Sequence, residues 1–575
     1  MKTTRLPFSS ASRLGALCAF LMLLAGPGRA QFPTTPTQTA YVCNAPGNQQ
    51  GVQAFADGAG GAYALWIDRR AGSQSGPGTA LYAQHLDAAG NPLLPANGLR
   101  LFQTKGREIW GLKAIPWNSG LLVAWVQGAF TIGGDSVRCQ FYDAAGTPQW
   151  AQPALIARRN TAATPSVIFV SENGLNIIPT STGAIITHDL AIGGNSARFT
   201  FNEVSSTGAV RWALNTNQVE VVSPSNYPLP NYRTVSDGAN GFYLVAHSSY
   251  SIGIQVQRFQ STGAVWSANR VLSADGPAGR GDGTPQPVLD PAGNLYVAWT
   301  SFDGDPLVSK ILPTGALGWP GPGYVNLCPF ASRQANPHAI WHDNALWMVW
   351  EDNRLGTTSY SCYAQKIDAA GNLAWSPDGA PVYNQAAQYL RPRLAPSDNG
   401  SVMAFYRTNT AFQAQKLLPT GAAAFAVNGV VLNSLVNDQP ATLDATSVYL
   451  DFAPVSQPNG SVQAYWSSGG VAGSGLNRDI LTARVQSSGS LLGVAERAAA
   501  AAGFEVYPNP ATSALTLRLP AGATATNMRL CDAQGRIVRT YADVSGVSVR
   551  GLPAGLYVLR ATLAGHAVSR RVMVE

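Results

Sequence analysis

The sequence predicts an all-β protein: a β-propeller, with eight blades favoured and seven as the second choice, followed by a small Ig-like β-sandwich. Two observations predict the propeller, namely two interleaved series of tight turns and the alternating apolar runs that follow them. A third, the different pattern of short strands at the C-terminal end, predicts the sandwich. The 59 glycines and 38 prolines of the 575-residue chain suit a fold with many turns.

A glycine-centred turn recurs eight times along the middle of the chain. The turn glycines are Gly90, Gly146, Gly208, Gly263, Gly315, Gly371, Gly421 and Gly489. The 399 residues from the first to the last of them span seven intervals, with a mean of 57 residues. A bulky aromatic residue often follows four positions after the glycine, at Trp150, Trp212, Trp319, Trp375 and Phe425.

A second series of eight turns lies out of phase with the first. Its central residues are Gly61, Gly120, Gly174, Gly241, Gly293, Asn344, Gly400 and Gly460. Most of them are followed by an alternating run that ends in an aromatic residue, such as Leu295–Trp299 or Val462–Trp466, which predicts a strand. Each unit therefore has four strands joined by two hairpins, and eight such units indicate a β-propeller.

The aromatic residues that end these strands are expected to fill wedges between neighbouring blades. They are Trp66, Trp125, Trp299, Trp350 and Trp466, with His247 and Tyr406 as weaker wedges in two other blades. Each buried tryptophan ring contributes about 5 kcal/mol of gross burial before entropy is subtracted. A platform for sugars is the less favoured alternative, because a repeated aromatic residue usually belongs to the core.

Five glutamines each precede a turn glycine by six positions: Gln84, Gln140, Gln257, Gln365 and Gln415. Function seldom needs five identical copies of one residue. The glutamines are therefore expected to make repeated hydrogen bonds within the sheets.

Polar residues follow the blade tryptophans, on the face that the loops between second and third strands share with the crossovers between blades. The candidates for ligand binding are Asp68, Arg70, Asp303, Asp305, Asp352, Arg354 and Arg407. The stretches Trp66–Arg70 and Trp350–Gly356 resemble a repeat common in secreted bacterial propeller proteins of unassigned activity. Their Asp and Arg residues could clamp a polar ligand such as a sugar. The favoured interpretation is a structural tie, in which Asp accepts loop amide hydrogen bonds and Arg pairs with it.

Local motifs of known chemistry are absent from the sequence. It contains no G-x-S-x-G elbow, no H-E-x-x-H, no phosphate loop and no Asp-rich calcium loop. His338 and His342 are spaced by four without an intervening Glu, and Asp303 and Asp305 beside Gly304 more often form a turn than a cation site. We therefore expect neither a metal nor a cofactor.

Two classes of function remain open. The favoured one is a non-catalytic surface propeller whose loop-rich face binds a glycan, a peptide or an envelope protein. The alternative is a hydrolase or lyase acting on polysaccharide, with acids from different blades near the axis. The first suspects for that role are Asp68, Asp303, Glu351 and Asp352. A site assembled from several blades leaves no local motif, so the sequence does not decide between the two.

The N-terminal residues predict export. Lys2, Arg5 and Arg13 precede an apolar stretch, Leu14–Ala25, and a small-residue site at Gly28–Ala30, which is typical of a signal peptide covering residues 1–30. Its apolar core is short, and no later segment approaches the roughly 20 apolar residues of a membrane helix. We expect a soluble monomer without a transmembrane segment.

Charge and cysteine content argue against a nucleic-acid-binding protein, a zinc protein and a disulfide-rich protein. Removal of residues 1–30 takes away four basic residues and lowers the formal net charge from +7 to about +3, which is no nucleic-acid footprint. The five remaining cysteines are Cys43, Cys139, Cys328, Cys362 and Cys531. They are scattered and include no C-x-x-C pair, so lone buried thiols are favoured over a zinc site or a disulfide framework.

The C-terminal residues carry three motifs. The first is Tyr507-Pro508-Asn509-Pro510, the second contains Gly535, and the third contains Gly555 and Tyr557. Their order and spacing resemble the C-terminal sorting domain of type IX secretion substrates. The resemblance implies passage from the periplasm through the outer membrane secretion machinery, usually followed by removal of the tail. It also implies a secreted or surface location on a Gram-negative bacterium.

The predicted organisation is then a signal peptide (1–30), a linker (31–42), the propeller (43–493), a second linker (494–503) and the sorting domain (504–575).

Overall fold

The computed structural model describes residues 32–575 apart from several segments. These are 71–77, 105, 130–132, 159–173, 193–195, 215–217, 221–230, 250–252, 274–284, 302, 357–358, 389, 436, 438–439, 441–451, 470–477, 492–504, 520–524, 533–535, 542–546 and 564–565. The predicted signal peptide and the predicted linker 494–503 therefore lie outside the described residues.

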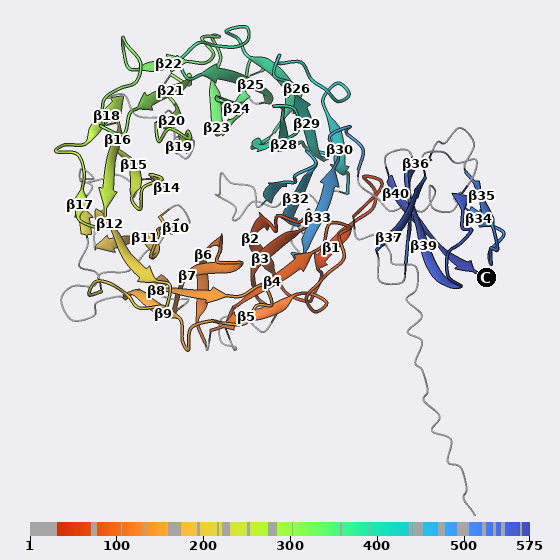
Figure 1. The fold of residues 1–575 in the computed structure, drawn as a ribbon. Helices are drawn as coiled ribbons and strands as arrows, with labels where there is room; N and C mark the ends of the chain where they lie inside the picture. The colour runs from red at the N-terminus through yellow and green to blue at the C-terminus, as the bar shows by residue number, and fades with distance from the viewer. Residues whose placement is uncertain are drawn as a thin grey trace, which may run out of the picture.

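Eight antiparallel sheets form a closed ring (Figure 1). Blades 1 and 2 contain β2 (Gln49–Ala56), β3 (Ala62–Asp68), β4 (Ala80–Leu86), β5 (Leu99–Gln103), β6 (Glu108–Trp117), β7 (Gly120–Ala129), β8 (Gly133–Tyr142) and β9 (Ala154–Arg158). Blades 3 and 4 contain β10 (Asn176–Pro179), β11 (Gly183–Ile192), β12 (Ser196–Ser205), β13 (Gln218–Glu220), β14 (Asn231–Ser236), β15 (Phe242–Ser249), β16 (Gly253–Gln260), β17 (Gly263–Ala264) and β18 (Arg270–Ser273).

Blades 5 and 6 contain β19 (Gln286–Leu289), β20 (Leu295–Thr300), β21 (Pro306–Ile311), β22 (Tyr324–Asn326), β23 (Gln334–His342), β24 (Ala345–Asp352), β25 (Tyr360–Asp368) and β26 (Ala380–Ala387). Blades 7 and 8 contain β27 (Arg393–Pro396), β28 (Val402–Arg407), β29 (Phe412–Leu417), β30 (Val430–Asn433), β31 (Phe452–Ser456), β32 (Val462–Ser467), β33 (Ile480–Val485) and β1 (Ala40–Cys43). The prediction of eight blades is confirmed.

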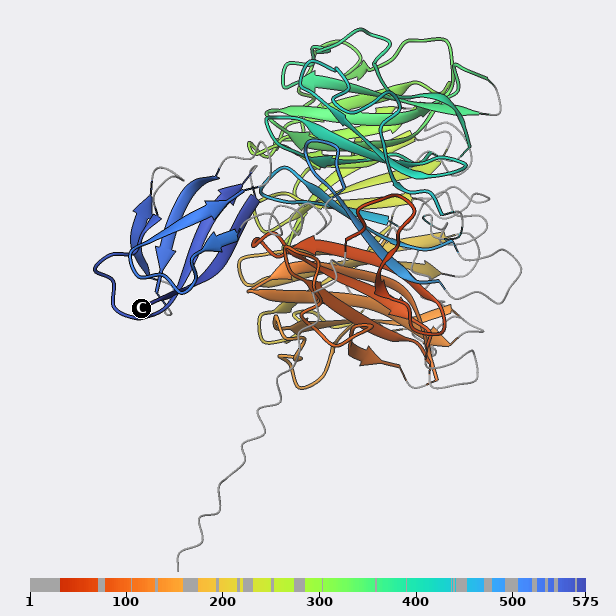
Figure 2. The same ribbon diagram turned by 90° about the vertical axis from the view of Figure 1, so that its right-hand side faces the viewer.

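The first strands of neighbouring blades contact one another, as β2 does with β6 and β31, and they lie toward the centre of the ring (Figure 1). The two hairpin turns of each blade therefore share one face, here called the turn face. The loops between second and third strands share the opposite face with the crossovers, here called the loop face. Figure 2 shows the ring from its side.

The N-terminal strand closes the ring. β1 is the outermost strand of blade 8 and pairs with β33, so that Ala40 lies opposite Thr482. Phe32 is 3% exposed and packs in the core cluster of blade 1, where a Cβ added to Gly90 would lie 2.7 Å from the phenylalanine ring. The segment 31–42, predicted as a linker, thus contains a core residue and most of a propeller strand.

Both series of turns connect the strands as expected, with two corrections. In blades 1 to 7 the first series joins third to fourth strands, as in the hydrogen bond from Gly90 N to Asp87 O (2.9 Å), but Gly489 follows β33, whose fourth-strand partner is β1. In the second series, Gly174 was predicted as the turn of blade 3, but it precedes β10. The turn lies at Thr180–Gly183, where Thr180 N donates to Gly183 O (2.9 Å). Both positions carry a glycine, so the local sequence does not show which of them forms the turn.

The five predicted tryptophan wedges and Tyr406 are core residues, whereas the side chain of His247 lies outside the described part of the structure. Trp66, Trp125, Trp299, Trp350 and Trp466 are at most 1% exposed. Trp66 and Trp350 donate their indole N–H groups to the carboxylates of Asp68 (2.9 Å) and Asp352 (3.2 Å). Tyr406 is also fully buried, and its hydroxyl donates to Asn428 O (2.7 Å). The sugar-platform alternative for these residues does not fit such burial.

Each of the five glutamines lies in the third strand of its blade and bonds to the loop that follows the turn glycine. Gln365 Nε2, for example, donates to Ser376 O (2.9 Å), and Gln415 Nε2 donates to Ala426 O (2.9 Å). Gln84, Gln140 and Gln257 make the equivalent bonds to Pro95 O, Trp150 O and Trp266 O. The prediction of repeated hydrogen bonds is confirmed.

Aromatic residues after the first-series turns hold neighbouring blades together. The Trp150 ring lies on Gly208 of the next blade, and its Nε1 donates to Ser206 O (3.0 Å). Gly208 has φ +85°, and a Cβ there would lie 2.7 Å from the ring, so only glycine fits. Trp266, Trp319 and Trp375 repeat this contact on Gly315, Gly371 and Gly421. Phe32 takes the same place on Gly90, in the blade that follows the closure.

The C-terminal residues form two sheets with a shared core. One sheet contains β34 (Glu505–Tyr507), β35 (Ala514–Arg518) and β38 (Val547–Ser548), and the other contains β37 (Ile537–Tyr541), β36 (Ala525–Cys531), β39 (Gly555–Leu563) and β40 (His566–Val574). Leu515 and Val547 of the first sheet belong to one cluster with Leu530 and Leu559 of the second. The predicted β-sandwich is therefore present.

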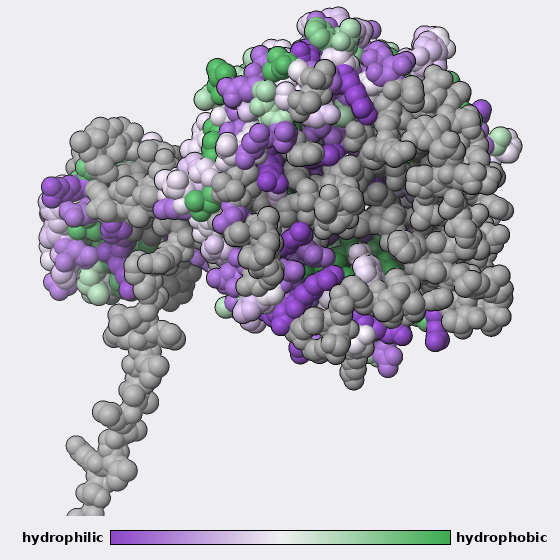
Figure 3. All heavy atoms as spheres, turned by 180° about the vertical axis from the view of Figure 1, so that it is seen from behind, coloured by the Kyte–Doolittle hydropathy of each residue, from purple (hydrophilic) through white to green (hydrophobic). Residues whose placement is uncertain are grey.

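Among the described residues, no helix is long and apolar enough to cross a membrane. The view from behind shows a surface on which the coloured residues are mostly hydrophilic, with hydrophobic residues in small separate patches (Figure 3).

Candidate functional site

The Asp–Arg pair of blade 1 is a buried structural tie. Asp68 is fully buried at the end of β3, and its carboxylate accepts hydrogen bonds from Arg70 Nη2 (2.7 Å), Arg70 Nε (3.0 Å) and Arg70 N (2.8 Å). Arg70 also donates to Asn97 O (2.8 Å) and lies over the Tyr82 ring at 3.9 Å. Both charges are therefore satisfied inside the protein.

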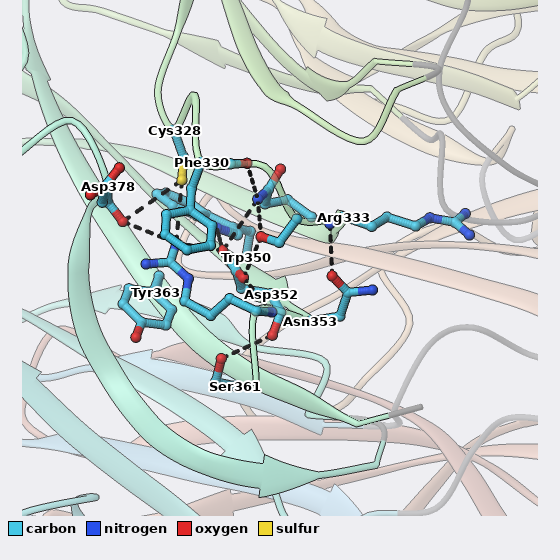
Figure 4. A network of polar contacts seen from close by, with 12 residues as sticks. Cys328, Phe330, Arg333, Trp350, Asp352, Asn353, Ser361, Tyr363 and Asp378 are labelled. Atoms are coloured by element: carbon cyan, nitrogen blue, oxygen red, sulfur yellow. Dashed lines mark hydrogen bonds and ion pairs between the residues drawn. The ribbon is translucent and has the colours of Figure 1, made fainter. Parts of the chain in front are cut away.

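Blade 6 repeats the tie (Figure 4). Asp352 is fully buried at the end of β24 and accepts from Arg354 Nη2 (2.6 Å), Arg354 N (2.9 Å) and Ser332 Oγ (2.8 Å). Arg354 donates to Asp378 O (3.1 Å) and lies over the Tyr363 ring at 3.6 Å. Burial works to raise the pKa of Asp352, but the hydrogen bonds from Arg354 and Ser332 outweigh it, and the pKa is lowered. Both pairs therefore have the geometry of the structural tie that the sequence favoured over ligand binding.

The crossovers beside the two ties share their first and last residues and differ at the positions in between. The first crossover runs from Cys43 to Gln49 before blade 1, and the second runs from Cys328 to Gln334 before blade 6. The backbone agrees with this alignment, because Arg69 N donates to Asn48 O and Asn353 N donates to Arg333 O. Two residues after the cysteine stands Ala45 in the first crossover and Phe330 in the second.

Phe330 is an exposed residue beside the tie of blade 6. Its ring lies over the Arg354 guanidinium at 4.4 Å, on a tie that already has Tyr363, and 39% of the residue stays exposed. Ala45 is 5% exposed, and the tie of blade 1 is complete without an aromatic residue there. A single exposed apolar ring is common on protein surfaces, so Phe330 is notable for the cleft that it borders and not for its exposure alone.

Phe330 borders an open cleft between blades 5 and 6 on the loop face. The cleft has a volume of about 690 Å³. Its walls come from the β20–β21 loop, the crossover from β22 to β23 and the β24–β25 loop, and its lining residues include Asp303, Asp305, Phe330, Arg333, Asn353 and Arg354. A volume of this size lies within the range of small-molecule sites. Three of the sequence candidates, Asp303, Asp305 and Arg354, are thus brought together.

The loops that form the cleft are tied to one another. Gln334 N donates to Gly304 O (2.9 Å), and Arg333 N donates to Asn353 Oδ1 (2.7 Å). Asp305 accepts from Asn326 Nδ2 (3.1 Å). These bonds link the described residues of the three walls to one another.

The remaining candidates lie elsewhere. Asp68 and Arg70 belong to blade 1, and Asp352 lies beneath the cleft inside the tie rather than in its lining. Arg407 ends β28 in blade 7, where its Nη1 donates to Pro440 O (2.9 Å) and burial lowers its pKa. Sequence reasoning missed Phe330 and Asn353. No local pattern singles out Phe330, because all five residues between the shared Cys and Gln differ between the two crossovers.

The acids suspected for catalysis are mostly engaged inside the protein. Asp68 and Asp352 belong to the ties, and Glu351 is 2% exposed and accepts from Arg391 N (2.7 Å) and Asn336 Nδ2 (2.5 Å). Asp303 is the member of this set that faces the open cleft. The described residues contain no group of three metal-binding side chains. The five cysteines are buried and unpaired, as expected.

The sorting motif residues fix the start of the tail to its last strand. The Asn509 side chain donates to Arg571 O (2.9 Å) and accepts from Met573 N (2.8 Å), which places Tyr507–Pro510 along β40. Tyr557 is 6% exposed, and its hydroxyl donates to Pro553 O (2.9 Å). Gly555 begins β39, and Gly535 lies outside the described residues.

Several solved structures are similar to this chain at low identity. The BP39L lectin from Burkholderia pseudomallei is 14% identical, with 67% of this chain and 97% of that chain covered and a TM-score of 0.41. A puromycin hydrolase is 14% identical at a TM-score of 0.38, with 76% of this chain covered, and this chain spans 63% of its length. The polysaccharide lyase Uly1 is 12% identical at a TM-score of 0.37, with 64% and 88% covered. No curated protein matches the chain.

The tail gives the specific match. Residues 505–575 match the family model described as a secretion system C-terminal sorting domain. This agrees with the three motifs and with the β-sandwich that they build. The chain is therefore a type IX secretion substrate that carries a C-terminal sorting domain and is exported to the cell surface or the extracellular space.

Proposed function

We propose that this exported propeller is a non-catalytic binding protein that binds carbohydrate in the cleft between blades 5 and 6. The observation that carries the proposal is the comparison of the two ties. The same Asp–Arg tie stabilises blades 1 and 6, yet only blade 6 adds the exposed ring of Phe330 beside an open cleft.

The lining of the cleft suits a sugar. An aromatic ring packs against the apolar C–H face of a pyranose, and Phe330 is held for that contact by its stack on Arg354. Carboxylates of Asp303 and Asp305 accept hydrogen bonds from hydroxyl groups. Asn353 uses its Oδ1 on Arg333 N, which leaves its amide N–H groups to donate to ligand oxygens.

Phe330→Ala is expected to weaken carbohydrate binding by at least about tenfold, because loss of a stacking ring typically removes more than 1 kcal/mol. Binding is measured by titration calorimetry of the full exported chain, with soluble bacterial and plant polysaccharides as probes. Leu93→Ala is the matched control, since Leu93 is also exposed (56%) but lies beside the turn at Gly90, on the turn face. Equal binding by wild type and Phe330→Ala would overturn the proposal.

The polysaccharide hydrolase or lyase remains the alternative, and Asp303 is the acid to examine. Release of reducing ends is followed in the same samples. Release by the wild type that is lost in Asp303→Asn, with the thermal midpoint unchanged, would replace the binding proposal by the enzymatic one.

We also propose that the mature chain consists of the propeller, ending near residue 493, with the tail removed after export. Intact mass of the protein recovered outside the producing cell should correspond to a chain without residues 504–575. The motivation is the sorting domain match at 505–575. Persistence of the tail on released protein would show that cleavage does not accompany export here.

A further inference from the structure

Two carboxylates line the cleft beside Phe330. They belong to Asp303, which is exposed, and Asp305, which is half-buried. Within the part of the chain that the structure describes, neither carboxylate takes part in an ion pair. The guanidinium of Arg354, which lines the same cleft, is bound to Asp352 at 2.6 Å inside the tie. Arg333 is the other cation in the lining of the cleft.

No positive charge is among the influences on the pKa of Asp305. Burial and the charge of Asp303 raise the pKa of Asp305 above its ordinary value, and the opposing influence is a hydrogen bond from the Asn326 amide. A neutral hydroxyl group would satisfy one acceptor atom of such a pair. A cation between the two carboxylates would relieve their mutual repulsion as well.

A metal ion fits this position poorly. Calcium takes six to eight oxygen ligands, whereas the described residues hold no group of three metal-binding side chains. Asn326 directs its amide nitrogen to Asp305 and uses its oxygen to accept from Cys328 N (2.9 Å), so that oxygen is not free for a metal. A group that brings hydrogen-bond donors together with the charge suits the two carboxylates better.

Phe330 provides the second element of recognition. Its partly exposed ring lines the same cleft as the two carboxylates. A sugar ring stacked on Phe330 would place a ring substituent in the cleft toward the acid pair, and an ammonium substituent is also attracted to the aromatic face. We infer that the cleft selects an amino sugar, a carbohydrate with a primary ammonium group, over the neutral N-acetylated form of the same sugar. This inference rests on the proposed carbohydrate site.

The test compares two probes of equal length, the glucosamine hexamer and the N-acetylglucosamine hexamer. Titration calorimetry of the full exported chain at pH 6 keeps the amine protonated, because a free amine next to a ring carbon titrates near the range of an α-amino group, about 7.7–8.0. We expect the glucosamine hexamer to bind at least about tenfold more tightly, the usual difference made by a charge-assisted hydrogen bond.

Variants separate the charge from the sugar site. Asp303→Asn with Asp305→Asn should abolish the preference, and Asp303→Asn alone, at an exposed position, should reduce it if the double variant does not fold. Asp378→Asn is the control, since Asp378 is an exposed acid outside the lining of the cleft and should leave the preference unchanged. Equal affinity for both hexamers, lost in Phe330→Ala, would overturn the inference and leave the sugar site standing. Binding of neither hexamer would also overturn it, while the polysaccharide probes judge the proposed function separately.

Discussion

Asp352→Asn is expected to lower the thermal midpoint of the propeller sharply. Asp352 is fully buried, and the side chain of its partner Arg354 is 9% exposed, so the substitution leaves a guanidinium inside the protein without its counter-charge. Removal of one partner of a buried ion pair destabilises a protein by about 3–5 kcal/mol. The variant also weakens the acceptor for Trp350 and Ser332. Differential scanning calorimetry of the full chain measures the change.

Three comparisons make this result specific. Asp68→Asn in blade 1 should have a similar effect, and Asp378→Asn, at an exposed acid, should have almost none. Addition of Arg354→Leu to Asp352→Asn should restore part of the stability, because no unpaired charge is left. A loss below about 1 kcal/mol, the usual range of surface ion pairs, would show that the tie is not buried as described.

The tie also predicts a pH dependence. The pKa of Asp352 is lowered in the folded protein from its ordinary value of 3.8. Its contribution to stability is therefore present above that ordinary value and is lost as the pH falls through the folded-state pKa. The difference in thermal midpoint between wild type and Asp352→Asn should shrink in strongly acidic buffer.

A chain that starts at Asn44 is expected to fail to close the ring. It lacks β1, so β33 loses its partner and becomes an exposed edge, and it also lacks the ring of Phe32 on Gly90. Removal of a buried phenylalanine ring alone costs about 3–5 kcal/mol. Hydrogen exchange measured by mass spectrometry should show loss of protection at Ile480–Val485, together with a lower thermal midpoint.

Single substitutions separate the two contributions. Phe32→Ala keeps β1 and should lower stability while protection of β33 is retained. Phe32→Leu, which keeps an apolar side chain, should cost less. If the chain that starts at Asn44 keeps native protection at Ile480–Val485, β1 is not what closes the ring.

Much of the fold could be predicted because each signal is set by nearby residues. Turn glycines mark the hairpins, since positions with positive φ, such as Gly90, favour glycine whatever the rest of the chain does. The alternation of Leu295–Trp299 places a strand and its buried aromatic end. The error at Gly174 has the same origin, because two glycines offered the same local signal and only strand pairing with β11 chose between the positions.

The candidate site could be predicted only in part. The Asp–Arg ties were readable, because both members lie two residues apart and recur in register. The cleft was not, because Asp303, Phe330 and Asn353 come from three separate loops of two blades. Phe330 belongs to no repeat, and it becomes a candidate through its position in the lining of the cleft.

The amino-acid sequence by itself determined the eightfold repeat, the strand and turn of each unit, the buried tryptophans and the sorting tail, since these depend on backbone conformation, side-chain periodicity and contiguous motifs. Only the tertiary structure decided that residues near the N-terminus complete the last blade, with Ala40 opposite Thr482, and that two acids and one aromatic ring share a cleft. The reason is that both arrangements join residues far apart in the chain, and the ring geometry alone brings them together.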